Sequence, residues 1–153
     1  MITYKTGDVT RATEPVILHG CNARGKMNSG VAKAIRARWP EAFTEYEKAY
    51  QNYGLVVGSN VYVNTSDGKL IVNAITQECY GRNPNVRYVD YDAVQLCLED
   101  ARTALDTMNH KSIAMPMFGA GLGNGDWNVI KSIISEEMQG IEVVVYVLEG
   151  VTL

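Results

Sequence analysis

Two glycine-rich segments, each between an apolar run and a helical pattern, carry the clearest chemical signal in this chain. The first spans residues 19–30 and follows the apolar run 15–18, and the second spans residues 119–127 and follows the apolar run 113–118. Glycine lets backbone approach a ligand closely, and the start of a helix presents unpaired N–H groups with partial positive charge. Two such loops in one small protein predict a ligand with two anionic groups, such as a diphosphate.

Few residues near the two glycine-rich segments have side chains that can transfer a proton. His19 ends an apolar run, where its imidazole can exchange a proton near neutral pH or serve as a hydrogen-bonded core residue. Asp126 can polarise a water molecule or cap the helix that follows it. His110 is the only other histidine, and no HExxH or clustered His, Asp and Glu set occurs. We therefore expect no metal and no cofactor.

Strand patterns alternate with helical patterns along the whole chain. Pro40 interrupts the helical region after the first glycine loop and starts a second helix. Strands are predicted at residues 2–5, 16–21, 60–63, 70–75, 113–118 and 143–148, and the later helices at residues 90–109 and 126–138. This alternation predicts an α/β protein, a three-layer α/β/α sandwich with a mostly parallel mixed central sheet. Ligands bind at the carboxyl ends of the strands in such sheets, where both glycine loops and the loop after Ile75 fall.

Composition limits the setting in which the protein works. A chain of 153 residues is most simply one domain, residues 1–153, that buries roughly two thirds of its unfolded surface. Its 14 basic and 17 acidic residues give a net charge of −3, which disfavours nucleic acid and anionic membranes as partners. The three cysteines fit no zinc motif and cannot all pair, so we expect a reducing, cytoplasmic location. We expect no membrane association and a monomer.

Five short motifs occur along the chain in an order that points to a known family. They are GDVT at residues 7–10, LHGCN at 18–22, GVA at 30–32, VNA at 72–74 and GAGL at 119–122. Together they resemble the macro domain family over essentially the whole chain. RWPEA at residues 38–42 and GDW at 125–127 look most like its ADP-ribose 1''-phosphate phosphatase branch, of bacterial and phage type.

The resemblance implies a role for each site residue. Asp8, followed by Val9, would accept a hydrogen bond from the adenine amino group, or else satisfy local backbone as a turn carboxylate. Asn22 would contact the distal ribose, or else cap its own loop. The residues expected to contact ADP-ribose are Asp8, Val9, Asn22, Gly30, Val31, Ala32, Thr76, Gly119, Ala120, Gly121, Leu122 and Gly123. The residues expected to act in catalysis are His19, Asn22 and Asp126.

The chain also departs from the family pattern. Many members carry consecutive glycines in the first loop, where this chain has Met27 and Asn28, and their side chains are expected to narrow the loop. The ester-hydrolase branch carries a lysine and an aspartate at the positions of Gln77 and Gly123, which argues against lysine-dependent deacylation. Arg24, Lys26 and Arg82 are cations that would reach a terminal phosphate, or else ordinary exposed charges.

The main hypothesis for function is an ADP-ribose-binding macro domain that converts ADP-ribose 1''-phosphate to ADP-ribose and phosphate without a metal. Its ligand would be ADP-ribose or ADP-ribose 1''-phosphate. Two alternatives remain open: a non-catalytic ADP-ribose reader, and a hydrolase that removes ADP-ribose from protein or nucleic acid.

Overall fold

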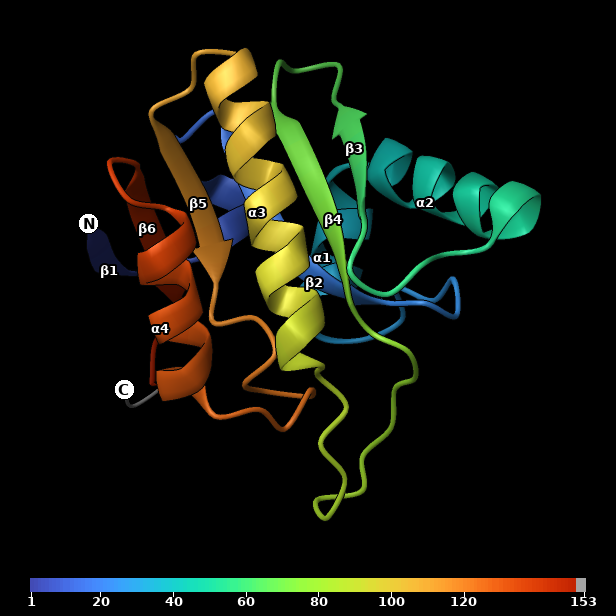
Figure 1. Ribbon diagram of the computed structural model, residues 1–153. Helices are drawn as coiled ribbons and strands as arrows, with labels where there is room; N and C mark the ends of the chain where they lie inside the picture. Colours follow the sequence, from blue (N-terminus) through green and yellow to red (C-terminus); the bar gives the residue numbers. More distant parts are fainter. Residues whose placement is uncertain (151–153) are drawn as a thin grey trace.

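A six-stranded mixed sheet forms the centre of the protein, and the computed structural model describes residues 1–150 (Figure 1). Strands and helices alternate along the chain as the sequence pattern predicts. The elements in chain order are β1 (Ile2–Thr6), the 3-10 helix η1 (Val9–Arg11), β2 (Val16–Asn22), α1 (Gly30–Arg38), α2 (Pro40–Tyr53), β3 (Asn60–Asn64), β4 (Leu70–Gln77), α3 (Tyr91–Thr107), β5 (Ser112–Pro116), α4 (Trp127–Glu137) and β6 (Glu142–Val147).

The strands follow the order β1-β6-β5-β2-β4-β3. All neighbouring pairs are parallel except β3 and β4, which form an antiparallel hairpin at one edge. β2 and β4 lie inside the sheet and are almost wholly buried, which explains why their sequences are continuous apolar runs. The prediction of a mostly parallel mixed sheet is confirmed.

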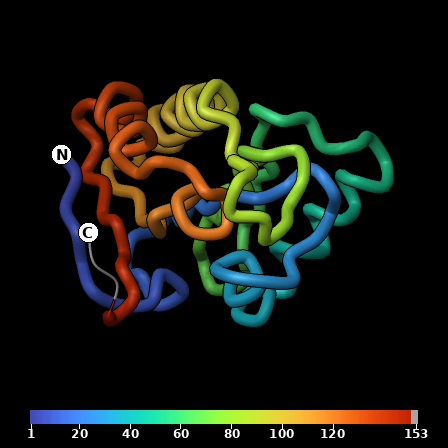
Figure 2. Tube along the Cα trace, turned by 90° about the horizontal axis from the view of Figure 1, so that it is seen from below, coloured from blue at the N-terminus to red at the C-terminus, as the bar shows by residue number. Residues whose placement is uncertain are grey.

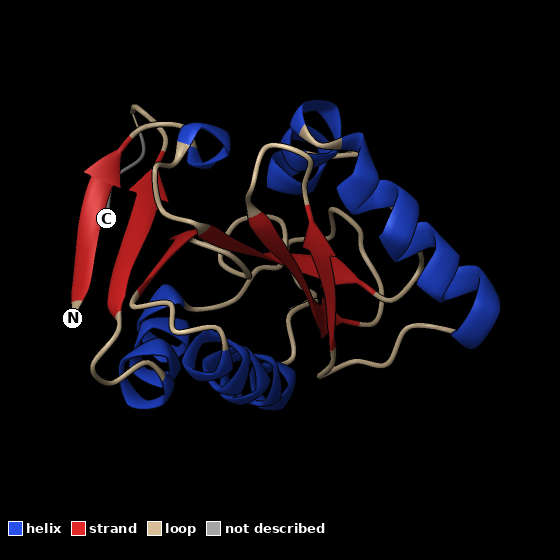
Figure 3. Cartoon of the chain, turned by 90° about the horizontal axis from the view of Figure 1, so that it is seen from above, coloured by secondary structure: helices blue, strands red, loops and turns tan. Residues whose placement is uncertain are grey.

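Helices cover both faces of this sheet, which gives the predicted three layers (Figure 3). α3 and α4 pack together over one face and bury a large cluster that includes Leu98 and Ile134. α1 and α2 cover the other face, where Ile35, Trp39 and Tyr46 are buried. The sheet is therefore shielded from water on both sides, as parallel sheets require.

Helix ends follow local chemistry that the sequence displays. Asp90 and Asp126 each accept backbone N–H bonds in the first turn of α3 and α4, so Asp126 acts as a helix cap. Pro40 starts α2 directly after Trp39, as predicted. α3 ends at Thr107, two residues earlier than predicted, because Asn109 adopts a left-handed backbone with φ of 58°. Ser29 precedes α1, but its side chain makes no capping bond.

Viewed along the strands, the loops after β2, β4 and β5 lie side by side at one edge of the sheet (Figure 2). These are the two glycine-rich loops and the loop that follows Gln77. Parallel strand order brings them together, since β2 lies between β4 and β5. Within residues 1–150, no helix has the length and apolar character needed to cross a membrane.

Candidate functional site

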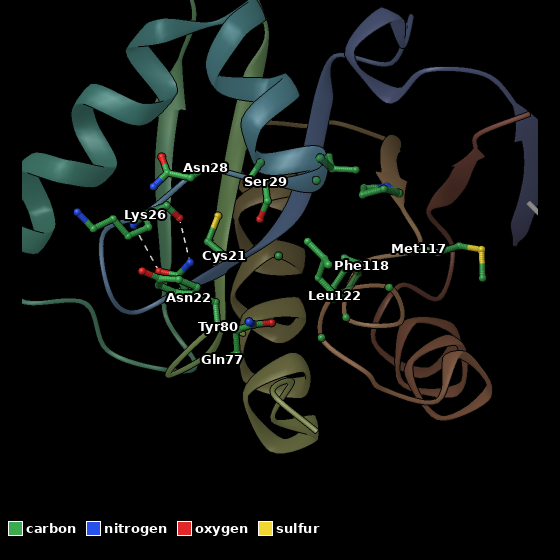
Figure 4. A pocket seen from close by; sticks show the side chains of 18 residues that line it. Cys21, Asn22, Lys26, Asn28, Ser29, Gln77, Tyr80, Met117, Phe118 and Leu122 are labelled. Atoms are coloured by element: carbon green, nitrogen blue, oxygen red, sulfur yellow. Dashed lines mark hydrogen bonds between the residues drawn. The ribbon is translucent and has the colours of Figure 1, made fainter. Parts of the chain in front are cut away.

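A cleft of about 290 Å³ opens at the carboxyl ends of β2, β4 and β5 (Figure 4). Its walls come from the three loops that the sequence analysis placed there. The lining residues are Gly20, Cys21, Asn22, Lys26, Asn28, Ser29, Gly30, Val31, Ala32, Gln77, Tyr80, Pro116, Met117, Phe118, Gly119, Gly121, Leu122 and Gly123. None of them carries a carboxylate or an imidazole, so the cleft is lined by backbone, apolar groups and neutral polar groups around Lys26.

The second glycine loop is shaped so tightly that a side chain cannot enter it. A Cβ on Gly123 would lie 2.6 Å from the carbonyl oxygen of Gly119. The same oxygen accepts a 2.7 Å hydrogen bond from the amide of Gly125, which closes the loop on itself. The amides of Gly121, Leu122 and Gly123 have no acceptor among residues 1–150. Free amides in a narrow turn are suited to bind an anion.

The opposite wall of the cleft begins with the first turn of α1. Gly30 adopts a left-handed backbone with φ of 61°, and a Cβ there would lie 3.2 Å from Leu122 Cδ1. The two loops therefore face each other across the cleft. The amides of Gly30, Val31 and Ala32 have no acceptor in the described part of the chain, as expected at a helix start. An anion between the loops can be bound from both sides.

Asn22 fixes the shape of the first loop. Its Oδ1 accepts hydrogen bonds from the amides of Arg24 and Lys26 at 2.9 and 3.4 Å, and its Nδ2 donates to the Lys26 carbonyl at 2.9 Å. Tyr46 of α2 donates its hydroxyl to the Asn22 carbonyl and to Oδ1, at 2.5 and 3.0 Å. This matches the alternative in which Asn22 caps its loop, and one Nδ2 hydrogen remains for a ligand.

Tyr46→Phe is expected to loosen this loop. The substitution removes the donor to Asn22 inside a partly buried site, at an expected cost of about 1–2 kcal/mol in the free energy of unfolding. ADP-ribose affinity is expected to fall as well, because Asn22 loses one of its anchors. Urea unfolding and calorimetric titration measure both effects. Tyr50→Phe is the matched control, since the Tyr50 hydroxyl makes no hydrogen bond within the described residues; equal losses in the two variants would contradict the role of Tyr46.

The Met27 side chain points into the core and does not narrow the first loop, contrary to the expectation from the sequence. Its side chain is buried, with 1% exposed, in a cluster with Cys21, Tyr46 and Ile75 beneath the loop. Asn28 lines the cleft but is exposed, and its Oδ1 accepts a 3.2 Å hydrogen bond from Arg36. The replacement of the family's glycines therefore anchors the loop to the core and leaves the cleft open.

His19 lies in the core and not in the cleft. Its side chain is fully buried, and Nε2 donates a 2.6 Å hydrogen bond to Asn73 Oδ1 in the tautomer that this contact requires. Burial lowers the pKa of His19 to about 4, so the ring is neutral at physiological pH. Asn73 in turn donates to the Ala42 carbonyl of α2. This geometry favours the structural alternative for His19.

Several other predicted site residues also lie outside the cleft wall. Asp8 precedes η1 at the same sheet edge, where it accepts hydrogen bonds from the Thr10 amide and hydroxyl, and Val9 beside it is buried. Thr76 is buried beneath Gly20, and its hydroxyl has no hydrogen-bond partner among residues 1–150. Ala120 lies between the lining residues Gly119 and Gly121 but is not itself a lining residue, and Asp126 caps the start of α4 outside the lining.

The last residue of β4 and the loop after it supply lining residues that were not predicted as ligand contacts. Gln77 Nε2 donates to the Cys79 carbonyl at 2.8 Å, and its Oε1 accepts no hydrogen bond from the described residues. Tyr80 is 54% exposed at the mouth of the cleft. Arg24, at the same end, is held by Glu78 and Cys79 at 3.8 and 3.2 Å. Only the position of this loop after a buried strand signalled its involvement.

Comparison with known proteins places the cleft in a family context. A macro domain family profile matches residues 18–134. The chain is 31% identical to a DNA ADP-ribosyl glycohydrolase of Mycobacterium tuberculosis over 156 residues, which covers 98% of this chain and 43% of that protein. The solved macrodomain of Mycobacterium tuberculosis DarG has a TM-score of 0.83 and 30% identity, with 95% of this chain and 97% of that chain covered.

The alignment with a member of the phosphatase branch covers a shorter part of the chain. An ADP-ribose 1''-phosphate phosphatase of Aspergillus clavatus is 36% identical over 52 residues, which is 33% of this chain. Relatives named DNA ADP-ribosyl glycohydrolases align over 95% or more of this chain, so the phosphatase branch expected from the sequence has the shorter similarity. The family profile covers most of the chain, and the fold, the order of motifs and the paired glycine loops agree with it. The chain therefore belongs to the macro domain family.

Proposed function

We propose that this protein binds ADP-ribose in the cleft and hydrolyses its bond to nucleic acid. The observation that carries this proposal is the meeting of two glycine loops whose unpaired amides face one cleft. A diphosphate is the ligand group that fits two such loops. The choice of nucleic acid rests on the relative named a DNA ADP-ribosyl glycohydrolase, of which this chain spans less than half.

The proposed contacts imply a direction for the ligand in the cleft. The amides at the start of α1 and in the second loop hold the diphosphate, and Asp8, beyond Val31, binds the adenine. The distal ribose then lies at the opposite end, beside Asn22 and Gln77. Figure 4 shows Asn22, Lys26 and Asn28 together on that side of the cleft, away from Met117. The nucleic acid therefore leaves the cleft past Lys26 and Asn28.

The reaction breaks the bond between C1'' of the distal ribose and the nucleic acid. Water adds to C1'', its proton passes to the departing group, and the sugar goes through a cation-like transition state. Because no carboxylate lines the cleft, positioning and fixed dipoles must supply the catalysis. Gln77 Oε1, which accepts no hydrogen bond from the described residues, would orient this water, while Asn22 Nδ2 would hold the ribose.

Release of ADP-ribose from a modified oligonucleotide tests the proposal. The purified protein is incubated with DNA that carries ADP-ribose on a base, and free ADP-ribose is measured by mass spectrometry. Asn22→Ala and Gln77→Ala are each expected to lower kcat/KM roughly 100-fold, since each removes a positioning contact. Gln95→Ala on α3 is the control and is expected to match the wild type. Tight ADP-ribose binding without any release would identify a reader and contradict the hydrolase.

Phosphatase activity on ADP-ribose 1''-phosphate is the second candidate, supported by the 52-residue similarity. Its substrate has the same ADP-ribose and differs only in the group on C1'', so the same cleft would bind it. His19 and Asp126 lie outside the lining, so water orientation falls to Gln77 here as well. A kcat/KM for phosphate release above that for the oligonucleotide would make the phosphatase the main function.

A further inference from the structure

A second groove adjoins the cleft on the side where the proposed substrate leaves. It lies between α1 and α2, has a volume of about 520 Å³, and is lined by Asn28, Lys33, Arg36 and Phe43 among others. We call it the α1–α2 groove. Asn28 lines both the cleft and this groove, so the two are continuous around one side chain. A polymer attached to the distal ribose can therefore pass from one to the other.

The charge around the α1–α2 groove has one sign. Residues 15–40 contain five of the 14 Lys and Arg residues and none of the 17 Asp and Glu residues. The groove itself is lined by two cations and no carboxylate. A comparable groove beside α3 is lined by Glu99 and Asp100 and is therefore acidic. The net charge of −3 does not reveal this separation of charge, because it sums the basic and the acidic faces.

Three of these cations have no carboxylate partner. Arg24 pairs with Glu78 and Arg38 pairs with Asp67, at 3.8 and 3.1 Å. Among residues 1–150, Lys26, Lys33 and Arg36 form no ion pair, and all three line the cleft or the groove. Cations left without acidic neighbours along a groove are suited to bind a row of phosphates.

Arg36 is also held in a fixed position. Its guanidinium lies 3.7 Å from the centre of the Phe43 ring, and it donates to Asn28 Oδ1 at 3.2 Å. The planar group is thus set in place before a ligand arrives, which lowers the entropy lost on binding. Its stacked guanidinium offers a flat surface of the kind on which a base can stack.

We infer that the α1–α2 groove binds the single nucleic-acid strand attached to the ADP-ribose, with phosphates on Lys26, Lys33 and Arg36. The inference rests on the proposed function for its substrate class. A single strand is required because a base that carries ADP-ribose in the cleft must leave its stack. The groove then fixes the strand while the loops hold the ADP-ribose.

Charge reversal at Lys33 tests the inference. Affinity for a short unmodified oligodeoxythymidylate is measured by fluorescence anisotropy over a range of salt concentrations, for Lys33→Glu and for the control Lys131→Glu on the opposite face. Lys33→Glu is expected to lower affinity roughly tenfold and to reduce the salt slope by about 0.7, the value for one lost phosphate contact on a single strand. Lys131→Glu is expected to leave both unchanged. Lys33→Gln removes the positive charge without reversing it, so its oligonucleotide affinity is expected to fall between those of Lys33→Glu and wild type.

The outcomes separate the groove from the proposed hydrolase. Equal losses of oligonucleotide affinity in Lys33→Glu and Lys131→Glu would overturn the groove as a nucleic-acid site. Displacement of the bound oligonucleotide by polyglutamate as readily as by unlabelled oligonucleotide would overturn it as well. Calorimetry with free ADP-ribose should give the same affinity in Lys33→Glu and wild type. Weaker oligonucleotide binding in Lys33→Glu together with no ADP-ribose release by wild type would uphold the groove and reject the hydrolase. Release by wild type with oligonucleotide binding unaltered in Lys33→Glu would reject the groove alone.

Discussion

Gly123→Ala is expected to reduce ADP-ribose affinity roughly 100-fold, equal to about 2.7 kcal/mol of binding free energy. The new Cβ would lie 2.6 Å from the Gly119 carbonyl oxygen and 3.0 Å from its Cα, and neither backbone atom can rotate away. The loop must therefore shift. The Gly123 carbonyl also accepts hydrogen bonds from the amides of Tyr88 and Val89, so the shift disturbs the loop after β4 as well. Isothermal titration calorimetry with ADP-ribose measures the loss.

Gly121→Ala is the matched control in the same loop. A Cβ at Gly121 meets nothing within 4 Å, and its backbone is not left-handed. Its affinity loss is expected to stay below about tenfold, from contact with the ligand alone. Thermal unfolding of both variants checks that the fold persists. Wild-type affinity in Gly123→Ala would show that the amides of this loop do not hold the diphosphate.

Stability is expected to fall by about 3 kcal/mol as the pH is lowered from 6.5 to 4, through His19 alone. Burial lowers the pKa of His19 to about 4, against an unfolded value of 6.5. Between these values the unfolded chain binds a proton that the folded chain excludes. The contribution of neutral His19 to the free energy of unfolding is therefore fully present above pH 6.5 and is lost progressively as the pH falls toward 4. Urea unfolding at a series of pH values measures it.

Comparison of two variants isolates the contribution of His19 from that of the carboxylates. In His19→Gln the pH-dependent loss above pH 4 is expected to shrink, whatever the cost of the substitution itself. In His110→Gln the wild-type dependence is expected to persist. The same slope in wild type and His19→Gln would mean that the ring is accessible to protons in the folded state. It would also reopen the choice between the core and catalytic alternatives for His19.

The elements of the fold could be predicted because each depends on its own residues. Apolar runs marked the strands β2 and β4, and Pro40 set the boundary between α1 and α2. The observed ends of the helices and strands differ from the predicted ends by one or two residues. At the end of α3 the left-handed backbone of Asn109 accounts for the difference. Parallel strand order then brought the glycine loops to one edge, which made the cleft predictable as well.

The side-chain environment of the site could not be predicted in the same way. Tyr46 reaches Asn22 from a helix 24 residues away, and nothing in either segment encodes that contact. His19 had two alternatives, a catalytic role or a place in the core, and the Met27 side chain was expected to narrow the first loop. Packing against Cys21, Tyr46 and Asn73 determined where both side chains lie.

The sequence by itself determined the layered fold, the family and the edge of the sheet at which the cleft lies, since these follow from local propensity, motif order and strand order. Only the tertiary structure decided which side chains line that cleft and where charge accumulates. Lys26, Lys33 and Arg36 are spread over eleven residues within a chain of net negative charge. Helix packing places Lys33 and Arg36 around one groove and Lys26 in the adjoining cleft, and none of the three forms an ion pair within the described residues. This spatial arrangement cannot be read from a composition.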